Sequence, residues 1–300
     1  MATYLQSSGA ISINCVNTVF GRGNNLNAYR GTTYYRSTGG AQTFSSGAIG
    51  MSCFYGTGPS ANNFTYTVSS NQTNFCMRAG AVSAGWNQST ALIVNINSGV
   101  IISSNGTGTP AMTIQGSFPG GVTITNSGVI VGMGGGGGGP TGNGAGGGTA
   151  LKVSSAVTFN NIGTIAGGGG GGGAGGFAQA IAYNPAGGGG GGGRSSYIAN
   201  SSGGTACHCF GGHPGSAGTY SSAGGGGAGG SYYCGCLGCS HGGSGGTGGG
   251  WGATGASGAC SSGGIGQLIA PGVGGAGGKA TCGSSNITWT GTGTRYGSIS

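Results

Sequence analysis

Cysteine and histidine are concentrated in the last third of the chain, where their spacing could carry chemistry. Seven of the ten cysteines and all three histidines follow residue 206. Thiolate and imidazole groups at this density could hold zinc or iron in a tetrahedral site. The same cysteines could instead form disulfides or stay as free thiols, and spacing does not separate the three alternatives. No cofactor is assigned beyond this structural metal, whose candidate ligands are Cys207, Cys209, His213, Cys234, Cys236, Cys239 and His241.

Catalytic chemistry is restricted by the complete absence of aspartate and glutamate from the 300 residues. General acid–base pairs, Ser-His-Asp triads and glycosidase dyads all need a carboxylate. A Cys-His nucleophile pair has suitable residue types, but nothing in the sequence orients it. The stretch before Lys279 is similar to a phosphate-binding loop, yet Val273 and Ala280 occupy positions that need glycine and Ser/Thr. We therefore expect a protein that is not an enzyme.

Charge and hydropathy exclude two further classes of function. The eight Lys and Arg residues give a formal net charge of +8, but they are spaced singly along the chain. Nucleic-acid binding needs a clustered basic face, so no nucleic-acid partner is expected. The first ten residues lack the basic and apolar regions of a secretory signal. No apolar run approaches the ~18 residues of a membrane-spanning helix, so we expect no membrane insertion.

The elements that must position these residues change in character near residues 131–134. Residues 1–130 hold 19 of the 84 glycines, and segments such as ALIVNINSGVII alternate apolar and polar side chains. This period of two, with many β-branched residues, predicts short strands. The one helical signal lies at residues 14–23, where Asn14 could cap a turn that Gly21 would end. We predict a mainly β fold with little or no helix.

Internal repeats indicate how the strands are arranged. SSGAISINC at residues 7–15 recurs as SSGAIGMSC at residues 45–53. A longer unit at residues 111–135 recurs at residues 150–170, and residues 91–106 are a shortened relative. Such repeats stack, because each copy buries an apolar face that its neighbour completes. The pattern predicts stacked hairpins or a short solenoid ahead of the glycine-rich region.

Three runs of six or seven glycines, at residues 134–139, 167–173 and 187–193, dominate the second half. A flexible linker is one interpretation. The runs have similar lengths, however, and apolar or aromatic islands separate them, which favours ordered rods. A polyproline-II-like chain rises ~3.1 Å per residue, so seven glycines would form a rod of roughly 20 Å. Hydrogen bonds between neighbouring rods would have to offset the large ordering entropy of glycine. We predict a polyglycine-II rod sandwich.

Several of these motifs together resemble a known class of protein. The motif SSGAISINC and its copy, the V-T-I-x-N-x-G-x-I units that lead into polyglycine, and the closing GKATCGSSNITWTGTGTRYGSIS resemble tailed-bacteriophage tail proteins with glycine-rich C-terminal regions. The glycine-rich region is similar to the polyglycine-II sandwich of T-even-type tail-fibre tip adhesins. The likeness to tail proteins spans both ends of the chain, although those proteins commonly carry Asp where Cys15 and Cys53 stand.

The resemblance implies a virion structural protein, a tail-fibre or tail-tip component whose loops between glycine rods adhere to the host surface. In the adhesins, variable loops at one end of the sandwich bind the receptor. Aromatic faces among small polar residues suit sugars or outer-membrane proteins. The alternative for each ring is that it only packs against the rod ends. The candidate receptor contacts in the islands are Phe177, Tyr183, Tyr197, Phe210, Tyr232, Tyr233 and Trp251.

The implied partners are other virion tail proteins and a host-surface receptor, either a glycan or an outer-membrane protein. A homo-oligomer is expected, with a trimer as the working assumption, located in the virion tail and extracellular after host lysis. The alternative is a glycine-rich filament or extracellular matrix subunit that binds no receptor. The expected regions are an N-terminal attachment region (1–60), a β-rich repeat region (61–133), a polyglycine-II domain with loops (134–280) and a C-terminal strand segment (281–300).

Overall fold

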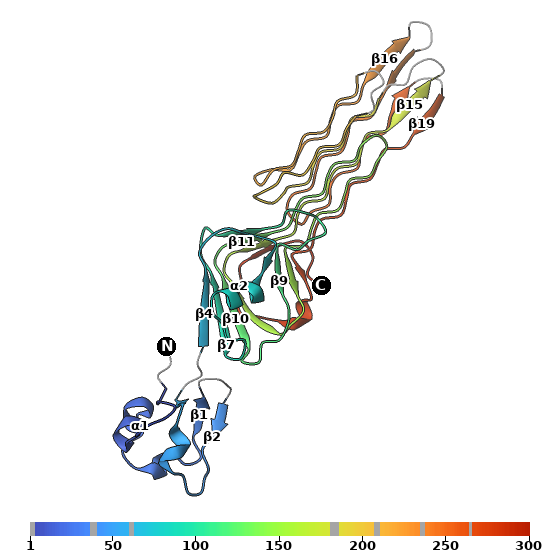
Figure 1. Ribbon diagram of the computed structural model, residues 1–300. Coiled ribbons are helices and arrows are strands. Elements are labelled where there is room, and N and C mark those ends of the chain that lie inside the picture. Colours follow the sequence, from blue (N-terminus) through green and yellow to red (C-terminus); the bar gives the residue numbers. More distant parts are fainter. Residues whose placement is uncertain are drawn as a thin grey trace.

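The chain forms three structural parts that follow one another in space (Figure 1). The computed structural model describes residues 4–36, 41–59, 63–180, 186–206, 211–234, 238–263 and 266–300. A small N-terminal unit lies at one end, a parallel β-solenoid in the middle and a bundle of glycine-rich segments at the other end. The described residues contain many short strands and two α-helices. The predicted mainly β fold with little helix is confirmed.

The N-terminal unit has its own apolar core. In chain order it contains α1 (Ile13–Phe20), η1 (Leu26–Tyr29), β1 (Thr33–Arg36), β2 (Ala41–Thr43), η2 (Met51–Phe54) and β3 (Thr57–Gly58). Aromatic side chains that include Tyr29 and Phe54 pack edge to face in this core, with ring centroids 5.3 Å apart. The helix predicted near residues 14–23 is confirmed as α1. Ser12 caps it rather than Asn14, and Gly21 ends it at φ 68°.

The middle part is a solenoid of three parallel sheets. The first sheet contains β4 (Asn63–Val68), β7 (Ala91–Ile96), β10 (Val122–Asn126), β13 (Val157–Asn161) and β21 (Ile287–Trp289). The second contains β5 (Gln72–Thr73), β8 (Ile101–Ser103), β11 (Val129–Val131), β14 (Thr164–Ala166) and β22 (Thr294–Tyr296). The third contains β6 (Phe75–Cys76), β9 (Met112–Ile114), β12 (Leu151–Val153) and β20 (Thr281–Cys282). Parallel pairing selects the solenoid over stacked hairpins, whose strands would be antiparallel.

The strand register explains the internal repeats. Met112 pairs with Leu151, and Thr123 pairs with Thr158, so the two long repeat units lie directly on one another. Alternate residues of each strand point inward and form a single apolar core that runs through the solenoid. The C-terminal strands β20, β21 and β22 extend the three sheets beyond β12, β13 and β14.

One helix of the solenoid was not predicted. α2 (Met77–Ser83) follows β6 directly and packs on β6 and β9. Met77 and Ala81, four residues apart, lie on its buried face. Its sequence MRAGAVS is too short to show a helical period against the surrounding strands. The 3-10 helix η3 (Ser284–Asn286) connects β20 to β21. No helix in the described part of the chain is long and apolar enough to cross a membrane.

Ten glycine segments leave the solenoid at one corner. Segments 1 and 2 connect β11 to β12, and segments 3 to 10 connect β14 to β20. Successive segments run in opposite directions, side by side (Figure 1). We call the end next to the solenoid proximal and the other end distal. In the described part of the chain, segments 1 to 10 comprise residues 132–139, 143–149, 167–176, 186–194, 201–206, 211–219, 223–230, 242–250, 253–261 and 270–279.

Backbone hydrogen bonds with a period of three connect the segments. In segment 3, the N–H groups of Gly170, Gly173 and Gly176 donate to carbonyl oxygens of segment 9. The N–H groups of the next residues, Gly171 and Ala174, donate to segment 2 and to the turn that precedes it. Those of Gly172 and Gly175 donate to segment 4. The donor–acceptor distances are 2.8 to 3.0 Å. The backbone N–H groups of segment 3 are therefore satisfied by neighbouring segments on three sides, whereas a β-strand bonds to neighbours on two sides at most.

Segments 3 and 4 are enclosed by the other eight, which explains their uninterrupted glycine runs. All residues of 167–173 and 187–193 are buried. A Cβ on any residue of 167–173 would lie 1.9 to 2.1 Å from a carbonyl oxygen of another segment. Outer segments differ, because segment 8 exposes every third residue and carries Ser244 and Thr247 at two of those positions. Burial on all sides thus requires glycine throughout the two seven-residue runs, 167–173 and 187–193.

Candidate functional site

The distal connections are built from short antiparallel strands. β15 (Phe177–Ala180) pairs with β19 (Gly266–Ile269). β16 (Ser231–Cys234) pairs with β17 (Gly238–His241), which pairs with β18 (Ser262–Gly263). These strands extend glycine segments that end together at the distal end (Figure 1). The described parts of the connections that follow segments 3, 7 and 9 are therefore brought to one end of the molecule.

The aromatic residues predicted as receptor contacts divide between the two ends. Phe177 begins β15 and Tyr232 lies in β16, so both belong to the distal connections, and both are half-buried. Tyr233 also lies in β16. Tyr183 and Phe210 lie outside the described residues.

Tyr197 and Trp251 lie on proximal connections, where Tyr197 follows segment 4 and Trp251 follows segment 8. The structure brings them together with Tyr220 and Tyr296, which sequence reasoning did not select. Ring centroids are 5.6 Å apart for Tyr197 and Tyr220, 5.2 Å for Tyr220 and Trp251, and 6.1 Å for Trp251 and Tyr296. We call these four residues the proximal aromatic array.

Arg194 anchors this array at the end of segment 4. Its guanidinium carbon lies 3.6 Å from the centroid of the Trp251 ring, a close cation–π contact. Its Nε donates to the carbonyl oxygen of Tyr220 at 2.8 Å, and the Trp251 indole donates to the carbonyl oxygen of Ser195 at 3.2 Å. Burial raises the pKa of the Tyr220 phenol, and the nearby charge of Arg194 offsets part of this rise. The array is thus fixed by contacts to three separate connections.

The candidate metal ligands are only partly described. His213 lies in segment 6 and His241 ends β17, and both are exposed. Cys234 belongs to β16 and Cys239 to β17. Cys207, Cys209 and Cys236 lie outside the described residues. Among the residues that the structure describes, no three His or Cys side chains come together as a metal site. The metal site therefore stays a prediction.

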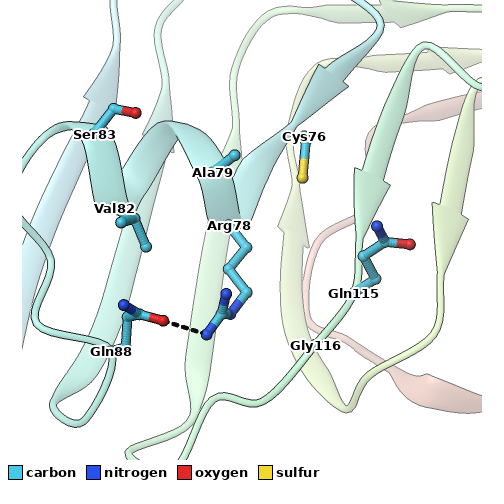
Figure 2. Close-up of a pocket in the computed structure, with 8 residues that line it drawn as sticks. All are labelled: Cys76, Arg78, Ala79, Val82, Ser83, Gln88, Gln115 and Gly116. Carbon is cyan, nitrogen blue, oxygen red and sulfur yellow. Dashed lines mark hydrogen bonds between the residues drawn. The ribbon is translucent and has the colours of Figure 1, made fainter.

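A groove beside α2 was not anticipated from the sequence. It has a volume of about 510 Å³ and lies between α2 and the loop that follows β9 (Figure 2). Arg78 donates to the side-chain oxygen of Gln88 across the groove and to the carbonyl oxygen of Ser117. Both acceptors are neutral, and no hydroxyl or thiol nucleophile is paired with a base among the residues drawn. The arrangement suits weak polar contact rather than catalysis.

Comparisons with known proteins agree with this architecture. The family model described as phage tail fibre adhesin Gp38 matches residues 63–300. A solved structure, the crystal structure of the gp37–gp38 adhesin tip complex of the bacteriophage S16 long tail fiber, matches with a TM-score of 0.53 and 25% sequence identity. The match covers 84% of this chain and 87% of the other. No curated protein matches the chain.

Proposed function

The chain belongs to the Gp38 family of phage tail fibre adhesins, and we propose that it contacts the host through its distal connections. Membership makes it a virion structural protein of the tail that mediates host attachment. Membership of an adhesin family does not agree with the alternative, a filament or matrix subunit that binds no receptor. Family and fold are those of structural adhesins, and we propose that the chain has no catalytic activity.

One observation carries the distal assignment. The glycine runs 167–173 and 187–193 leave no room for a side chain, whereas the described strands of the distal connections, β15 to β19, carry side chains. Binding residues are commonly placed on loops that a fixed scaffold presents together. Phe177 and Tyr232 provide aromatic surface at this end. We propose that they contact the receptor together with Tyr183, Phe210 and Tyr233, and that the receptor is a glycan or an outer-membrane protein.

We further propose that the ten glycine segments form a polyglycine-II sandwich. The three-residue period of the hydrogen bonds in segment 3 supports this, because a polyglycine-II chain has three residues per turn. The exposure of every third residue in segment 8 has the same period. Such a sandwich would hold the distal connections at fixed positions relative to one another.

Attachment to the phage is proposed for the N-terminal unit. The similar solved structure is a complex of gp37 and gp38 at the tip of a long tail fibre. We propose that this chain likewise binds a tail-fibre protein of its own phage, through residues 4–59. Their separate core and their place at the end opposite the distal connections support this role. Several copies per particle, as in the expected trimer, would strengthen adhesion by multivalency. We also propose that the virion is released to the extracellular space by lysis.

The proposal is tested by competition for host adsorption. Purified wild-type protein should block adsorption of the phage that carries it. The variant Phe177→Ala/Tyr232→Ala should need roughly tenfold more protein for the same block, because aromatic contacts dominate many interfaces. The control Ile162→Ala removes a side chain that is 61% exposed on the solenoid and should block like the wild type. Equal blocking by all three folded proteins would contradict the distal assignment.

A further inference from the structure

The proximal aromatic array presents open aromatic surface outside the distal site. Tyr197 is 55% exposed and Tyr296 is 46% exposed, at the two ends of the array. Ile198, next to Tyr197, is also exposed. The inner rings, Tyr220 and Trp251, are half-buried and support the outer ones. The four rings follow one another in contact and include two exposed members, and we call the surface that they form the platform.

The platform is held by the fold and does not depend on a mobile loop. Tyr296 belongs to β22, and its carbonyl oxygen accepts a hydrogen bond from Gly167 of central segment 3. Trp251 is fixed by its indole hydrogen bond and by Arg194. Tyr197 packs edge to face on Tyr220, at an interplanar angle of 90°. A platform fixed in this way loses little conformational entropy when a ligand stacks on it.

The charge beside the platform is positive and has no internal counter-charge. Arg194 is half-buried, and the acceptor recorded for it in the described part of the chain is the neutral carbonyl oxygen of Tyr220. No side-chain carboxylate can neutralise it, because the sequence contains no Asp or Glu. A guanidinium in this setting favours a carboxylate or phosphate group on a ligand. An anionic group near Arg194 could therefore bind while a ring of the same ligand lies on an aromatic face.

We propose that the proximal aromatic array and Arg194 form a second binding site, specific for an acidic saccharide chain of the bacterial surface. Pyranose rings would stack on Tyr197 and Tyr296, and a sugar carboxylate would pair with Arg194. The site goes beyond the proposed function, because it lies at the other end of the glycine segments and uses none of the distal residues. It would hold the adhesin against surface polysaccharide while the distal connections engage the receptor.

The test uses the full chain and two tetrasaccharides that differ in charge. Tetragalacturonic acid is the anionic probe and maltotetraose is the neutral one, and binding is measured by calorimetry and saturation-transfer NMR. Tetragalacturonic acid should bind at least about fivefold more tightly, and raising the salt concentration should weaken its binding. Equal affinity for the two probes, or no binding of either, would overturn the proposal.

Variants then locate the binding. The double variant Tyr197→Ala/Tyr296→Ala should bind tetragalacturonic acid more weakly than the wild type. The expected loss of affinity is roughly fivefold or more for each ring that is removed. Tyr197→Phe should retain most of the affinity, since it keeps the ring. Arg194→Gln should remove the preference for the anionic probe. The control Val273→Ala changes a side chain that is 57% exposed on segment 10 and should bind like the wild type.

A folded double tyrosine variant that binds like the wild type would contradict the proposed site even if Arg194→Gln fails to fold. The distal proposal is judged separately, because blocking of phage adsorption by Phe177→Ala/Tyr232→Ala is measured on cells and saccharide binding is measured on pure protein. Loss of saccharide binding in that distal variant would also contradict the proximal site.

Discussion

Gly171 lies against the main chain of Gly136 so closely that a Cβ on Gly171 would be 1.9 Å from the Gly136 carbonyl oxygen. The other sides of Gly171 are also occupied. Its N–H donates to the carbonyl oxygen of Ala145 at 2.9 Å, and its carbonyl oxygen accepts from the N–H of Gly275 at 2.7 Å. Three separate glycine segments thus meet at this one residue.

Substitution of Gly171 should therefore destabilise the protein strongly. Gly171→Ala should lower the free energy of unfolding by at least about 3 kcal/mol, because neighbouring backbone cannot move aside. The melting temperature should fall by more than about 6 °C. Gly250→Ala is the matched control, since a Cβ there would meet nothing within 4 Å. Similar melting temperatures for the two variants, measured by calorimetry, would show that the segments are not packed as described.

The central glycine runs and the stacked repeats could be predicted from the sequence for a physical reason. Only glycine fits at a position such as Gly171, so a run of such buried positions appears in the sequence as an uninterrupted run of glycines. The repeat units predicted stacking because Met112 and Leu151 occupy equivalent positions, and they pair in the solenoid. Segments 5 to 10 were harder to predict from the sequence, because exposed positions such as Thr247 accept side chains and interrupt the glycine pattern.

A buried asparagine pair inside the solenoid should also contribute to stability. The side-chain N–H of Asn126 donates to the side-chain oxygen of Asn161 at 2.8 Å, and both residues are fully buried. Asn161→Ala would leave a buried donor without this acceptor, at a cost of about 1–3 kcal/mol. Thr123→Ala, on the exposed face of β10, should change stability by less than about 0.5 kcal/mol. Urea unfolding of the two variants measures the difference, and equal midpoints would refute the role of the pair.

Stability should decrease at alkaline pH, partly through Tyr220. Burial raises the pKa of this phenol in the folded state above the usual value of about 10. Above a pH of about 10, the unfolded chain loses the phenol proton more readily than the folded chain does. The free energy of unfolding therefore falls as the pH rises. Burial raises the pKa of Tyr29 and Tyr66 in the same direction.

Tyr220→Phe should reduce this alkaline slope. The measurement is urea unfolding of the wild type and the variant at several pH values between 9 and 11. A slope unchanged by the substitution would mean that the phenol has the same affinity for its proton in both states.

The candidate site could be predicted only in part, because a sequence does not show which end of a bundle a connection occupies. Phe177 and Tyr197 stand in similar islands, yet one lies at the distal end and the other at the proximal end. Alternation of chain direction at every turn is the signal that could have separated them. Tyr296 could not be found in this way, since β22 brings it to Trp251 from the C-terminal end of the solenoid.

The central claim is that the glycine segments form an ordered scaffold and not a tether, because the placement of both sites depends on it. Amide hydrogen exchange over residues 167–176 tests this most directly, with a synthetic peptide of the same ten residues as the reference. All ten N–H groups donate hydrogen bonds, so exchange in the protein should be slowed by several orders of magnitude. Exchange of these amides at the rate of the free peptide would contradict the account.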